Sequence, residues 1–365
     1  MTNELCALHV TAMELENFRN FKQAKFCFDR HRTAVCGDNA RGKSNLLESI
    51  YFLAIGKSGR GARDRDVVRW GSDFFSIEAV TERDSQPVPL RIAYDSRVGK
   101  KKAFLDASPL PRLSDLVGRF NAVLFSPEDV DLVLRDPPQR RRLLDILVSQ
   151  CNAAYLSDLD QFRRALSQRN RLLKENSHLD PSQLMPWNAQ LAELGARIVL
   201  ARLEALDEIR PIAQDFYSRI SATPEELGSA YRSLVKEEER ARAQEILADA
   251  LLDRQAEEFS LGYTLSGPHR DNLLFSLDGR SAHQFASKGQ LKSVLLAWKL
   301  SEASFLESRT GYAPVLLMDD IFSELDGKRA ESLLDLVASF GQVVLTSARD
   351  PDLAFGEKGY EKIQL

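Results

Sequence analysis

Residues 37–44 carry the most direct indication of chemistry in this chain. They read Gly-Asp-Asn-Ala-Arg-Gly-Lys-Ser and match the phosphate-loop pattern GxxxxGKS. An apolar run at 33–36 precedes them and an amphipathic segment at 45–54 follows, so the loop lies between an expected strand and an expected helix. Such a loop turns its backbone amides inward, and the helix start offers further amides to a phosphate. The segment predicts a nucleoside triphosphate site.

Two side chains of the loop have distinct expected roles. Lys43 is placed to reach the β- and γ-phosphates, and Ser44 is placed to give its hydroxyl to Mg²⁺. The alternative is a glycine-rich turn that precedes a lysine by chance. The three constrained positions and the strand–loop–helix context disfavour that alternative.

Two consecutive acids follow a short apolar run near the C-terminus. Residues 315–318 are Val-Leu-Leu-Met and lead directly into Asp319 and Asp320. Such a run is typical of a strand in the middle of a parallel sheet, which delivers the acids to its carboxyl end. We predict that Asp319 belongs to the metal's water shell and that Asp320 polarises the attacking water, with Lys43 completing the catalytic set. A core strand that ends in an ordinary polar turn is the alternative.

A second anion-seeking helix start is expected at residues 287–290. Ser287 is a favoured N-cap, Gly289 exposes its amide, and apolar residues follow at helical spacing from residue 291. One chain needs only one γ-phosphate site. The two helix starts therefore hint that they belong to different active sites.

Composition limits the class of protein. The chain has 365 residues, 44% hydrophobic and 28% charged, and can form two or three compact units. No stretch reaches the roughly 18 apolar residues of a membrane span, and no basic-then-apolar export signal is present. We expect a cytoplasmic protein with no membrane partner. The spacing of the four cysteines, Cys6, Cys27, Cys36 and Cys151, does not suggest zinc, so free thiols are expected.

Charge gives mixed information about nucleic acid. The net charge of −4 and the pI near 5.9 do not indicate a nucleic-acid-binding protein. Basic residues nevertheless cluster locally, and such clusters are also typical of solvated faces. The candidate DNA contacts are Lys100, Lys101, Lys102, Arg140, Arg141 and Arg142.

The pattern of elements predicts an α/β protein. Strands are expected before the loop and at 75–80, 90–94 and 122–125. From about residue 137 the pattern becomes helical and continues to about 255, with breaks expected at 177–186, Pro211 and 223–228. The later expected elements are strands at 263–265, 273–277, 315–318 and 342–346 and helices at 289–308 and 328–340.

The simplest account is one nucleotide-binding domain, with a mixed sheet and flanking helices, interrupted by a mostly helical lobe. The predicted domains are the N-terminal part of the head at 1–130, the helical lobe at 131–258, and the C-terminal part of the head at 259–365.

The order of these motifs resembles ABC-type and SMC-like ATPase heads, in which the signature helix of one protomer caps the triphosphate of the other. Within these heads the chain resembles the RecF family of bacterial DNA replication and repair proteins. The matching segments span nearly the whole chain in family order. They are 15–21, the phosphate loop with 44–48, 125–129, 138–145, the Ser-Gly-Pro-His-Arg-Asp stretch at 266–271, 287–290, and the acids at 319–326.

The resemblance implies ATP and Mg²⁺ as cofactors. The implied metal ligands are Ser44, Asp319 and Glu128. The implied contacts to ATP in the same chain are Gly37, Asn39, Ala40, Arg41, Gly42, Lys43, Ser44 and Asn45. The implied contacts across a homodimer, to ATP bound by the partner, are Ser287, Gly289, Gln290 and Asp326.

The resemblance also implies a function. The implied function is that of a weak, DNA-stimulated ATPase that acts in recombinational repair and replication-fork maintenance. ATP would join two protomers, and the dimer would bind duplex DNA at gaps. RecR, together with RecO, would be the protein partner in placing the strand-exchange recombinase on single strands. Slow ATP hydrolysis would release the dimer, and the protein would associate with the nucleoid.

Some positions depart from the family pattern. Lys288 replaces a usual glutamine, and Leu291 and Lys292 replace a usual glutamine–arginine pair. The segment 346–349 lacks the switch histidine of transporter ATPases, so slow turnover is expected. His269, within the 266–271 stretch, is expected to be a turn residue bonded to the backbone rather than a catalytic group.

Other functions explain less of the sequence. A transporter ATPase predicts a switch histidine and an LSGGQ-type signature, and both are missing. Another SMC-like head would need long coiled-coil arms, and an OLD-type nuclease would need a nuclease domain where about 45 residues follow Asp320. A small-molecule kinase leaves the signature-like helix and the D-loop at 323–326, which follows the second acidic motif, unexplained.

Overall fold

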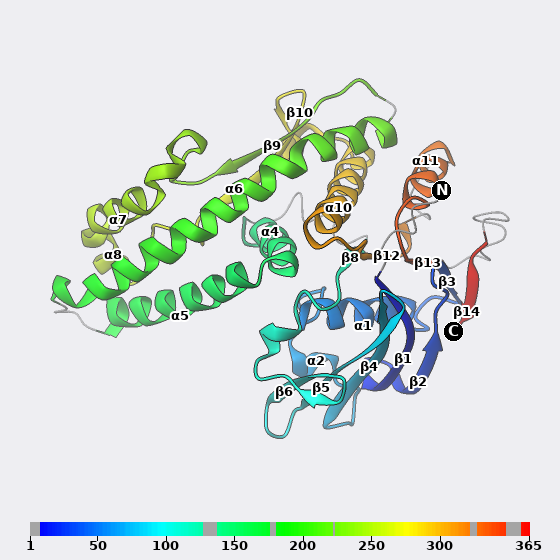
Figure 1. Ribbon diagram of the computed structural model, residues 1–365. Helices are drawn as coiled ribbons and strands as arrows, with labels where there is room; N and C mark the ends of the chain where they lie inside the picture. Colours follow the sequence, from blue (N-terminus) through cyan, green and yellow to red (C-terminus); the bar gives the residue numbers. More distant parts are fainter. Residues whose placement is uncertain (1–7, 127–136, 176–179, 222, 322–326, 348–358) are drawn as a thin grey trace. The chain divides into compact units, whose positions relative to one another are not determined.

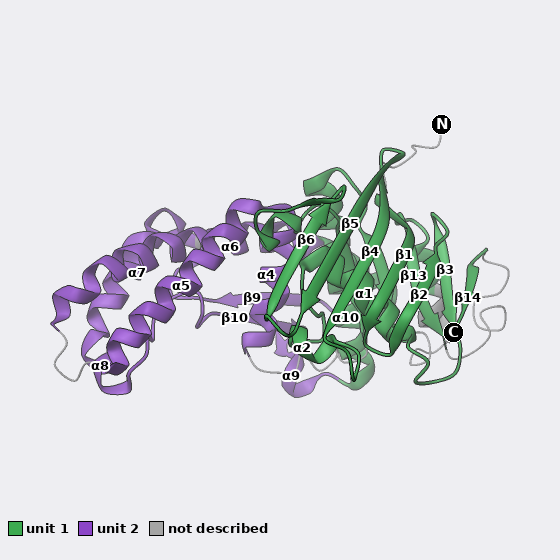
Figure 2. Cartoon of the chain, turned by 90° about the horizontal axis from the view of Figure 1, so that it is seen from below, with its two compact units in different colours: residues 1–131, 212–224, 287–365 green, residues 132–211, 225–286 purple. Residues whose placement is uncertain are grey.

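The computed structural model describes residues 8–126, 137–175, 180–221, 223–321, 327–347 and 359–365. Its contacts divide the chain into two compact units, coloured separately in Figure 2. Unit 1 comprises 1–131, 212–224 and 287–365, and unit 2 comprises 132–211 and 225–286.

A five-stranded parallel sheet forms the centre of unit 1 (Figure 1). Its strand order is β14-β3-β13-β12-β8. Strands β13 and β12 are buried along their whole length, as their unbroken apolar runs require of strands with both faces covered. The bounds are Arg32–Cys36 for β3, Ala122–Phe125 for β8, Val315–Met318 for β12, Val343–Ser347 for β13 and Glu361–Gln364 for β14.

A second, antiparallel sheet also belongs to unit 1, with strand order β2-β1-β4-β5-β6-β7. Helix α1 (Lys43–Ile55) contacts strands of both sheets, and every residue from Leu46 to Ile55 is buried, so this helix is covered on all sides. The strand bounds are Leu8–Phe18 for β1, Phe21–Cys27 for β2, Phe74–Arg83 for β4, Gln86–Asp95 for β5, Lys100–Leu105 for β6 and Ser108–Pro109 for β7.

The remaining helices of unit 1 are short, apart from α10. Helix α10 packs against β8. The bounds are Asp64–Val67 for α2, Leu113–Leu116 for the 3₁₀ helix η1, Lys288–Thr310 for α10 and Gly327–Val337 for α11. The strands predicted at 315–318 and 342–346 and the helix predicted at 289–308 are confirmed.

Unit 2 is mostly helical, with a small antiparallel sheet of order β11-β10-β9. Its long helices are α4 (Pro137–Cys151), α5 (Ala153–Glu175) and α6 (Met185–Ser221), whose last residues belong to unit 1. The other elements are the 3₁₀ helices η3 (Pro181–Leu184) and η4 (Glu237–Arg242), helices α7 (Ala243–Asp253), α8 (Gln255–Leu261) and α9 (Ala282–Phe285), and strands β9 (Leu227–Arg232), β10 (Asn272–Leu277) and β11 (Arg280–Ser281).

Two predictions about this region were wrong, and one strand was missed. The helix does not break at Pro211, because buried neighbours such as Ile209 and Ala213 hold it together across the lost backbone hydrogen bond. Strand β9 was not predicted, since its pairing with β10 is a long-range contact. Residues 263–265 form no strand, and they lie in the irregular segment after α8.

The contact division differs from the predicted domain limits in two regions. Residues 212–224 were predicted to belong to the helical lobe, but they group with unit 1. Residues 259–286 were predicted to belong to the C-terminal part of the head, but they group with unit 2, where β10 pairs with β9. Among the described residues, no helix is long and apolar enough to cross a membrane. Cys27, Cys36 and Cys151 form no disulfide within the part of the chain that the structure describes, and Cys6 lies outside that part.

Candidate nucleotide-binding site

The phosphate loop joins β3 to α1 and needs its glycines. Gly42 is the N-cap of α1. Its φ of 109° is a backbone conformation that residues other than glycine rarely adopt. A Cβ atom at this position would lie 2.5 Å from Nδ2 in the side chain of Asn20, which is too close for two such atoms. Asn20 in turn donates a hydrogen bond to the carbonyl of Arg41 at 2.9 Å. The side chain of Asn20 therefore fixes the loop where α1 begins.

Lys43 is folded back over its own loop. Its side chain is buried, and Nζ donates to the carbonyls of Gly37 at 2.6 Å and Asp38 at 3.0 Å. Both partners are neutral carbonyls, so no described carboxylate neutralises the ammonium through these bonds. Its positive charge thus lies within the loop and remains available to an anion.

Ser44 and Asp319 are 275 positions apart in the sequence, and the structure brings them into contact. Ser44 Oγ donates to Asp319 Oδ1 at 2.8 Å, and Thr346 Oγ1 donates to the same oxygen at 2.8 Å. The cause is the strand order. Strands β3, β13 and β12 are parallel neighbours, so the residues after their carboxyl ends meet at one edge of the sheet.

The two consecutive acids differ in their environment. Asp319 is 4% exposed, whereas Asp320 is half-buried. Asp320 has φ of 46°, in the left-handed region, and its amide donates to Thr346 Oγ1 at 2.8 Å. Thr346 thus contacts both acids, since its hydroxyl donates to the Asp319 carboxylate and accepts from the Asp320 amide.

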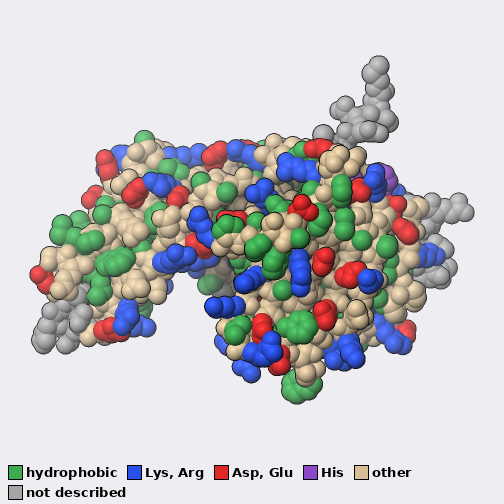
Figure 3. Space-filling view, turned by 60° about the horizontal axis from the view of Figure 1, so that its bottom comes forward, with side chains coloured by type: hydrophobic (Ala, Val, Ile, Leu, Met, Phe, Trp, Pro, Cys, Tyr) green, Lys and Arg blue, Asp and Glu red, His purple; other side chains and the backbone are tan. Residues whose placement is uncertain are grey.

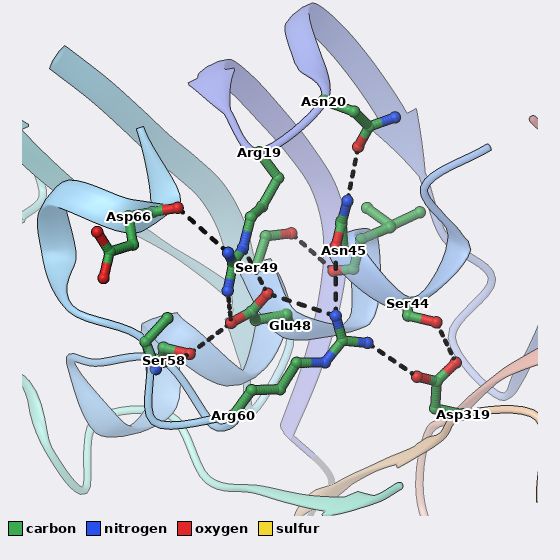
Figure 4. Close-up of polar contacts among 12 residues, drawn as sticks. Arg19, Asn20, Ser44, Asn45, Glu48, Ser49, Ser58, Arg60, Asp66 and Asp319 are labelled. Atoms are coloured by element: carbon green, nitrogen blue, oxygen red, sulfur yellow. Dashed lines mark hydrogen bonds and ion pairs between the residues drawn. The ribbon is translucent and has the colours of Figure 1, made fainter. Parts of the chain in front are cut away.

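Arg60 joins Asp319 to a second acid, Glu48, which lies on α1 (Figure 4). Its Nη2 donates to Asp319 Oδ2 at 3.2 Å, and its Nη1 lies 4.0 Å from Glu48 Oε2. Arg19 binds Glu48 through two hydrogen bonds of 2.8 and 2.9 Å, and Ser58 donates to the same carboxylate at 2.5 Å. This charged cluster fixes the segment after α1 against the phosphate loop.

This donor set fits magnesium and a triphosphate. Mg²⁺ prefers hard oxygen ligands, and the Ser44 hydroxyl and Asp319 carboxylate are such ligands in direct contact with each other. The loop supplies the amide turn and the Lys43 ammonium that phosphates require. Sequence reasoning assigned no role to Arg19, Glu48 or Thr346 and left an adenine-side role of Arg60 undecided, because each joins the site through tertiary contacts that local spacing does not reveal.

The predicted residues of the partner's site lie at the start of α10. Ser287 caps the helix by accepting from the amide of Gln290 at 3.2 Å, and its own amide donates to Gln290 Oε1 at 2.8 Å. Ser287 is exposed, while Gly289 and Gln290 are half-exposed. The predicted N-cap is thus confirmed. Glu128 and Asp326, predicted to contact metal and nucleotide, lie outside the described residues.

The three lysines of β6 face different ways. Lys101 donates to Asp64 Oδ1 at 2.6 Å and lies 5.2 Å from the centre of the Phe52 ring. Lys100 and Lys102 are exposed, since alternate residues of a strand point to opposite faces. Lys100 and Lys102 therefore remain DNA candidates, while Lys101 has a contact within the protein.

The three arginines of α4 are less available than predicted. Arg140 is buried and donates to Asn272 at 2.9 Å, so its predicted direct contact with DNA is not supported by its position. Arg141 donates to the carbonyl of Asp271 at 2.5 Å, and burial lowers its pKa. Arg142 is half-exposed. Of the three, Arg141 and Arg142 remain candidates.

The 266–271 stretch is structural. His269 Nε2 and the guanidinium of Arg270 both bond the carbonyl of Thr264, so the prediction of a turn residue bonded to the backbone is confirmed. Burial lowers the pKa of His269 to about 4, and nearby arginines oppose its protonation further. Asp271 accepts from the hydroxyl of Tyr231 at 2.6 Å, and burial raises its pKa.

Comparison with known sequences gives a consistent set of relatives. A family model described as the RecF/RecN/SMC N terminal domain matches residues 9–362. The DNA replication and repair protein RecF of Heliobacterium modesticaldum is 37% identical over 98% of both chains. The protein of the same name from Lactobacillus johnsonii is 37% identical over 93% of this chain and 92% of its own.

Solved structures give the same result. The recombination mediator protein RecF-ATPrS, described as part of the RecFOR pathway, matches with a TM-score of 0.89 and 30% identity over 98% of this chain and 96% of that one. An Smc head bound to the C-winged helix domain of ScpA matches with a TM-score of 0.56 and 15% identity, over 98% of this chain and 93% of that one. The second likeness shows the fold only.

Proposed function

The chain belongs to the RecF family, and from this premise we propose that it is an ATP-dependent DNA-binding protein of recombinational repair and replication-fork maintenance. The observation that carries the proposal is the contact of Ser44 with Asp319 at the edge of the parallel sheet, next to the phosphate loop. It joins a hydroxyl from one nucleotide-binding motif to the carboxylate of another.

Each residue has a definite task in this proposal. The loop amides of 37–42 and the ammonium of Lys43 bind the phosphates of ATP. Ser44 and Asp319 hold Mg²⁺, which when bound neutralises charge on the phosphates. Thr346 and Arg60 keep the Asp319 carboxylate in place through hydrogen bonds. Asp320 orients and polarises the attacking water.

The dimer follows from the second helix start. The exposed Ser287 and the half-exposed Gly289 present the N-terminal end of α10 to the surface, where it can contact ATP held by another copy of the chain. ATP contacted by both chains stabilises the dimer relative to the monomer. Neither copy then contains a complete ATP-hydrolysis site by itself. Slow hydrolysis of ATP separates the two copies.

The DNA partner is duplex at gapped junctions, bound mainly through phosphates and therefore sensitive to salt. Lys100 and Lys102 are the exposed lysine candidates on β6. DNA stimulates a weak ATPase, and RecR with RecO is the protein partner, as the RecFOR pathway of the solved relative suggests. The place of action is the nucleoid.

The test compares the parent with Lys43→Arg and Ser287→Arg. We expect Lys43→Arg to bind ATP weakly without hydrolysing it, because the larger guanidinium does not fit the contacts with Gly37 and Asp38. We expect Ser287→Arg to bind ATP and to stay monomeric. Ser308→Arg is the matched control, since Ser308 is an exposed serine at the opposite end of α10. The measurements are light scattering and duplex binding with and without ATP.

Two outcomes count against parts of this proposal. A Ser287→Arg variant that dimerises at the parent's ATP concentration removes the role of α10 in the partner's site. A parent protein whose oligomeric state and duplex affinity do not respond to ATP contradicts the proposed function as a whole.

A further inference from the structure

Trp70 is the most exposed large apolar side chain among the described residues, at 96%. It belongs to a turn of unit 1 between α2 and β4, and it is not part of the phosphate loop or of the Asp319 cluster. An indole ring exposed to this extent presents its flat faces to solvent, where a ligand could stack on them. Exposed hydrophobic and basic side chains occur next to one another on the surface in Figure 3.

Hydrogen bonds to Asn17 of β1 and to Arg19, which follows β1, fix the turn that carries Trp70. The amide of Arg69 donates to the carbonyl of Asn17 at 2.7 Å, and the amide of Arg19 donates to the carbonyl of Val67 at 2.8 Å. Two residues after Trp70, the hydroxyl Oγ of Ser72 donates to Asn17 Oδ1 at 3.1 Å. Trp70 is thus presented on a fixed backbone, which lowers the entropy lost when a ligand stacks on it.

A cavity of about 650 Å³ lies beside the ring. Its walls include Trp70, the basic residues Arg65 and Arg69, and the acids Asp66 and Asp73. Within the described part of the chain, the guanidinium groups of Arg65 and Arg69, and also of Arg63, have no side-chain hydrogen bond or ion pair, whereas Asp64 of the same segment is taken by Lys101. The cavity therefore combines an aromatic face, unpaired cations and hydrogen-bond acceptors.

We infer that this surface, defined by Arg65, Asp66, Arg69, Trp70 and Asp73, binds an unpaired nucleotide of DNA. A base can stack on the indole, its amino groups can donate to a carboxylate, and its phosphates can pair with the arginines. An acidic peptide fits less well, because its carboxylates can pair with the arginines but it offers no base to stack on the indole. A base inside a duplex does not expose its face, so the ligand is the single-stranded part of a gapped substrate.

The inference rests on the proposed function for its substrate, DNA, and adds where the unpaired strand binds. It assigns duplex binding and single-strand binding to different residues. Loss of Trp70 should therefore weaken binding only where a single-stranded segment is present.

The experiment measures affinity by fluorescence anisotropy, with ATP, for a blunt duplex and for the same duplex with a single-stranded oligo(dA) flank, whose bases carry an amino group. The variants are Trp70→Ala, the conservative Trp70→Phe, and Met185→Ala as a control for loss of an exposed apolar side chain, since Met185 is 63% exposed in unit 2. We expect Trp70→Ala to bind the flanked DNA about tenfold more weakly than the parent, with unchanged affinity for the blunt duplex. Trp70→Phe should retain most of the affinity.

Intrinsic fluorescence gives a second readout. Stacking of bases should quench the parent's tryptophan emission, and the quenching should disappear in Trp70→Ala, because Trp298 is buried and Trp187 is half-buried. Trp187→Phe should keep the quenching.

The outcomes separate the two proposals. If the parent binds the blunt duplex in the presence of ATP and Trp70→Ala binds the flanked DNA as well as the parent does, this inference is overturned and the proposed function stands. A protein partner would then be the remaining occupant of the surface. An equal loss on both substrates also overturns the inference. A parent that binds neither DNA contradicts the proposed function itself.

Discussion

Two clusters of arginine and carboxylate side chains, one in each unit, differ in the partners that surround their acids. In unit 2 the buried Arg202 donates to Asp145 at 2.7 Å, to the hydroxyls of Tyr155 and Tyr231 at 3.0 and 2.7 Å, and to the carbonyl of Pro268 at 3.0 Å. These partners come from α4, α5, β9 and the 266–271 stretch. Burial opposes ionisation of Asp145, but the charge of Arg202 and the hydrogen bond from Tyr155 outweigh it and lower the pKa of Asp145.

In unit 1 the cluster of Arg19, Glu48, Arg60 and Asp319 is partly open to solvent on its arginine side. The side chain of Arg60 is 29% exposed and that of Arg19 is 21% exposed, while both acids are buried. One oxygen of Asp319 is bonded to Ser44 and Thr346, and the other to Arg60. A metal ion that binds Asp319 can replace contacts of this kind without unfolding the unit.

The difference separates a structural cluster from a binding cluster. Buried acids whose cation is itself fully buried, as in unit 2, hold helices and a strand together and leave no room for a ligand. Acids whose cationic partners reach solvent, as in unit 1, can exchange a partner for a ligand. His269, Arg270 and Asp271 look like a catalytic set in the sequence, but Asp271 belongs to the structural cluster of Arg202, and His269 and Arg270 bond the carbonyl of Thr264.

The largest expected effect is the loss of Arg202. Arg202→Met leaves Asp145 and Asp271 buried without their cation, and we expect the free energy of unfolding to fall by about 3–5 kcal/mol. Urea denaturation measures the change. The control Arg197→Met removes an arginine of the same unit that is 55% exposed, and should cost less than about 1 kcal/mol. If both variants lowered the free energy of unfolding by a similar small amount, burial would not distinguish the ion pair of Arg202 from that of Arg197.

Loss of an arginine from the cluster of unit 1 should lower the free energy of unfolding by less. Arg19→Met removes both hydrogen bonds to the buried Glu48, but Ser58 still donates to it and Arg60 remains nearby. We expect a loss of about 2 kcal/mol together with weaker ATP binding, measured by denaturation and by nucleotide titration. Lys25→Met breaks an exposed pair with Glu14 in the same unit and should change neither quantity. A loss as large as that of Arg202→Met would remove the contrast between the clusters.

A pH effect is expected from His269. Its pKa in the fold is about 4 against 6.5 for the free side chain, so the unfolded chain binds the proton more readily. The stabilisation is present above pH 6.5 and is lost as the pH falls from 6.5 towards 4, by about 2 kcal/mol. Denaturation of the parent and of His269→Gln across this range measures it. If both proteins lose stability equally, the histidine is not the cause.

The smallest effect on stability is expected for Ser44. Ser44→Ala removes one of the hydrogen bonds to Asp319, and we expect a loss of about 1 kcal/mol or less. Affinity for ATP in the presence of Mg²⁺ should fall strongly, and Ser44→Thr, which keeps the hydroxyl, should retain it. Nucleotide titrations with and without Mg²⁺ test this. An alanine variant with the parent's Mg²⁺-dependent affinity would exclude Ser44 from the metal site.

Much of unit 1 could be predicted because its signals are local. The phosphate loop, the apolar run before Asp319 and the Ser287 cap are each defined by residues within a few positions of one another. Spacing of this kind fixes backbone geometry directly, and the strands and helices around these motifs lie where the sequence predicts them. The resemblance to a known family also rests on these segments.

The errors fall where long-range packing outweighs local preference. Pro211 predicts a break, but the burial of its neighbours along α6 holds the helix together. Arg140 reads as a surface charge in a run of three arginines, yet its position on α4 turns it inward to Asn272. Local sequence cannot show such partners, because they are 132 positions away.

The sequence by itself determined that this chain has a phosphate loop, an acid-tipped core strand and a second capped helix start, since hydrogen bonding and side-chain spacing act over a few residues. Only the tertiary structure decided that Ser44, Thr346 and Arg60 converge on Asp319, and that Trp70 remains in solvent. The physical reason is that strand order and packing set which distant residues become neighbours, and a linear pattern contains neither distance nor exposure.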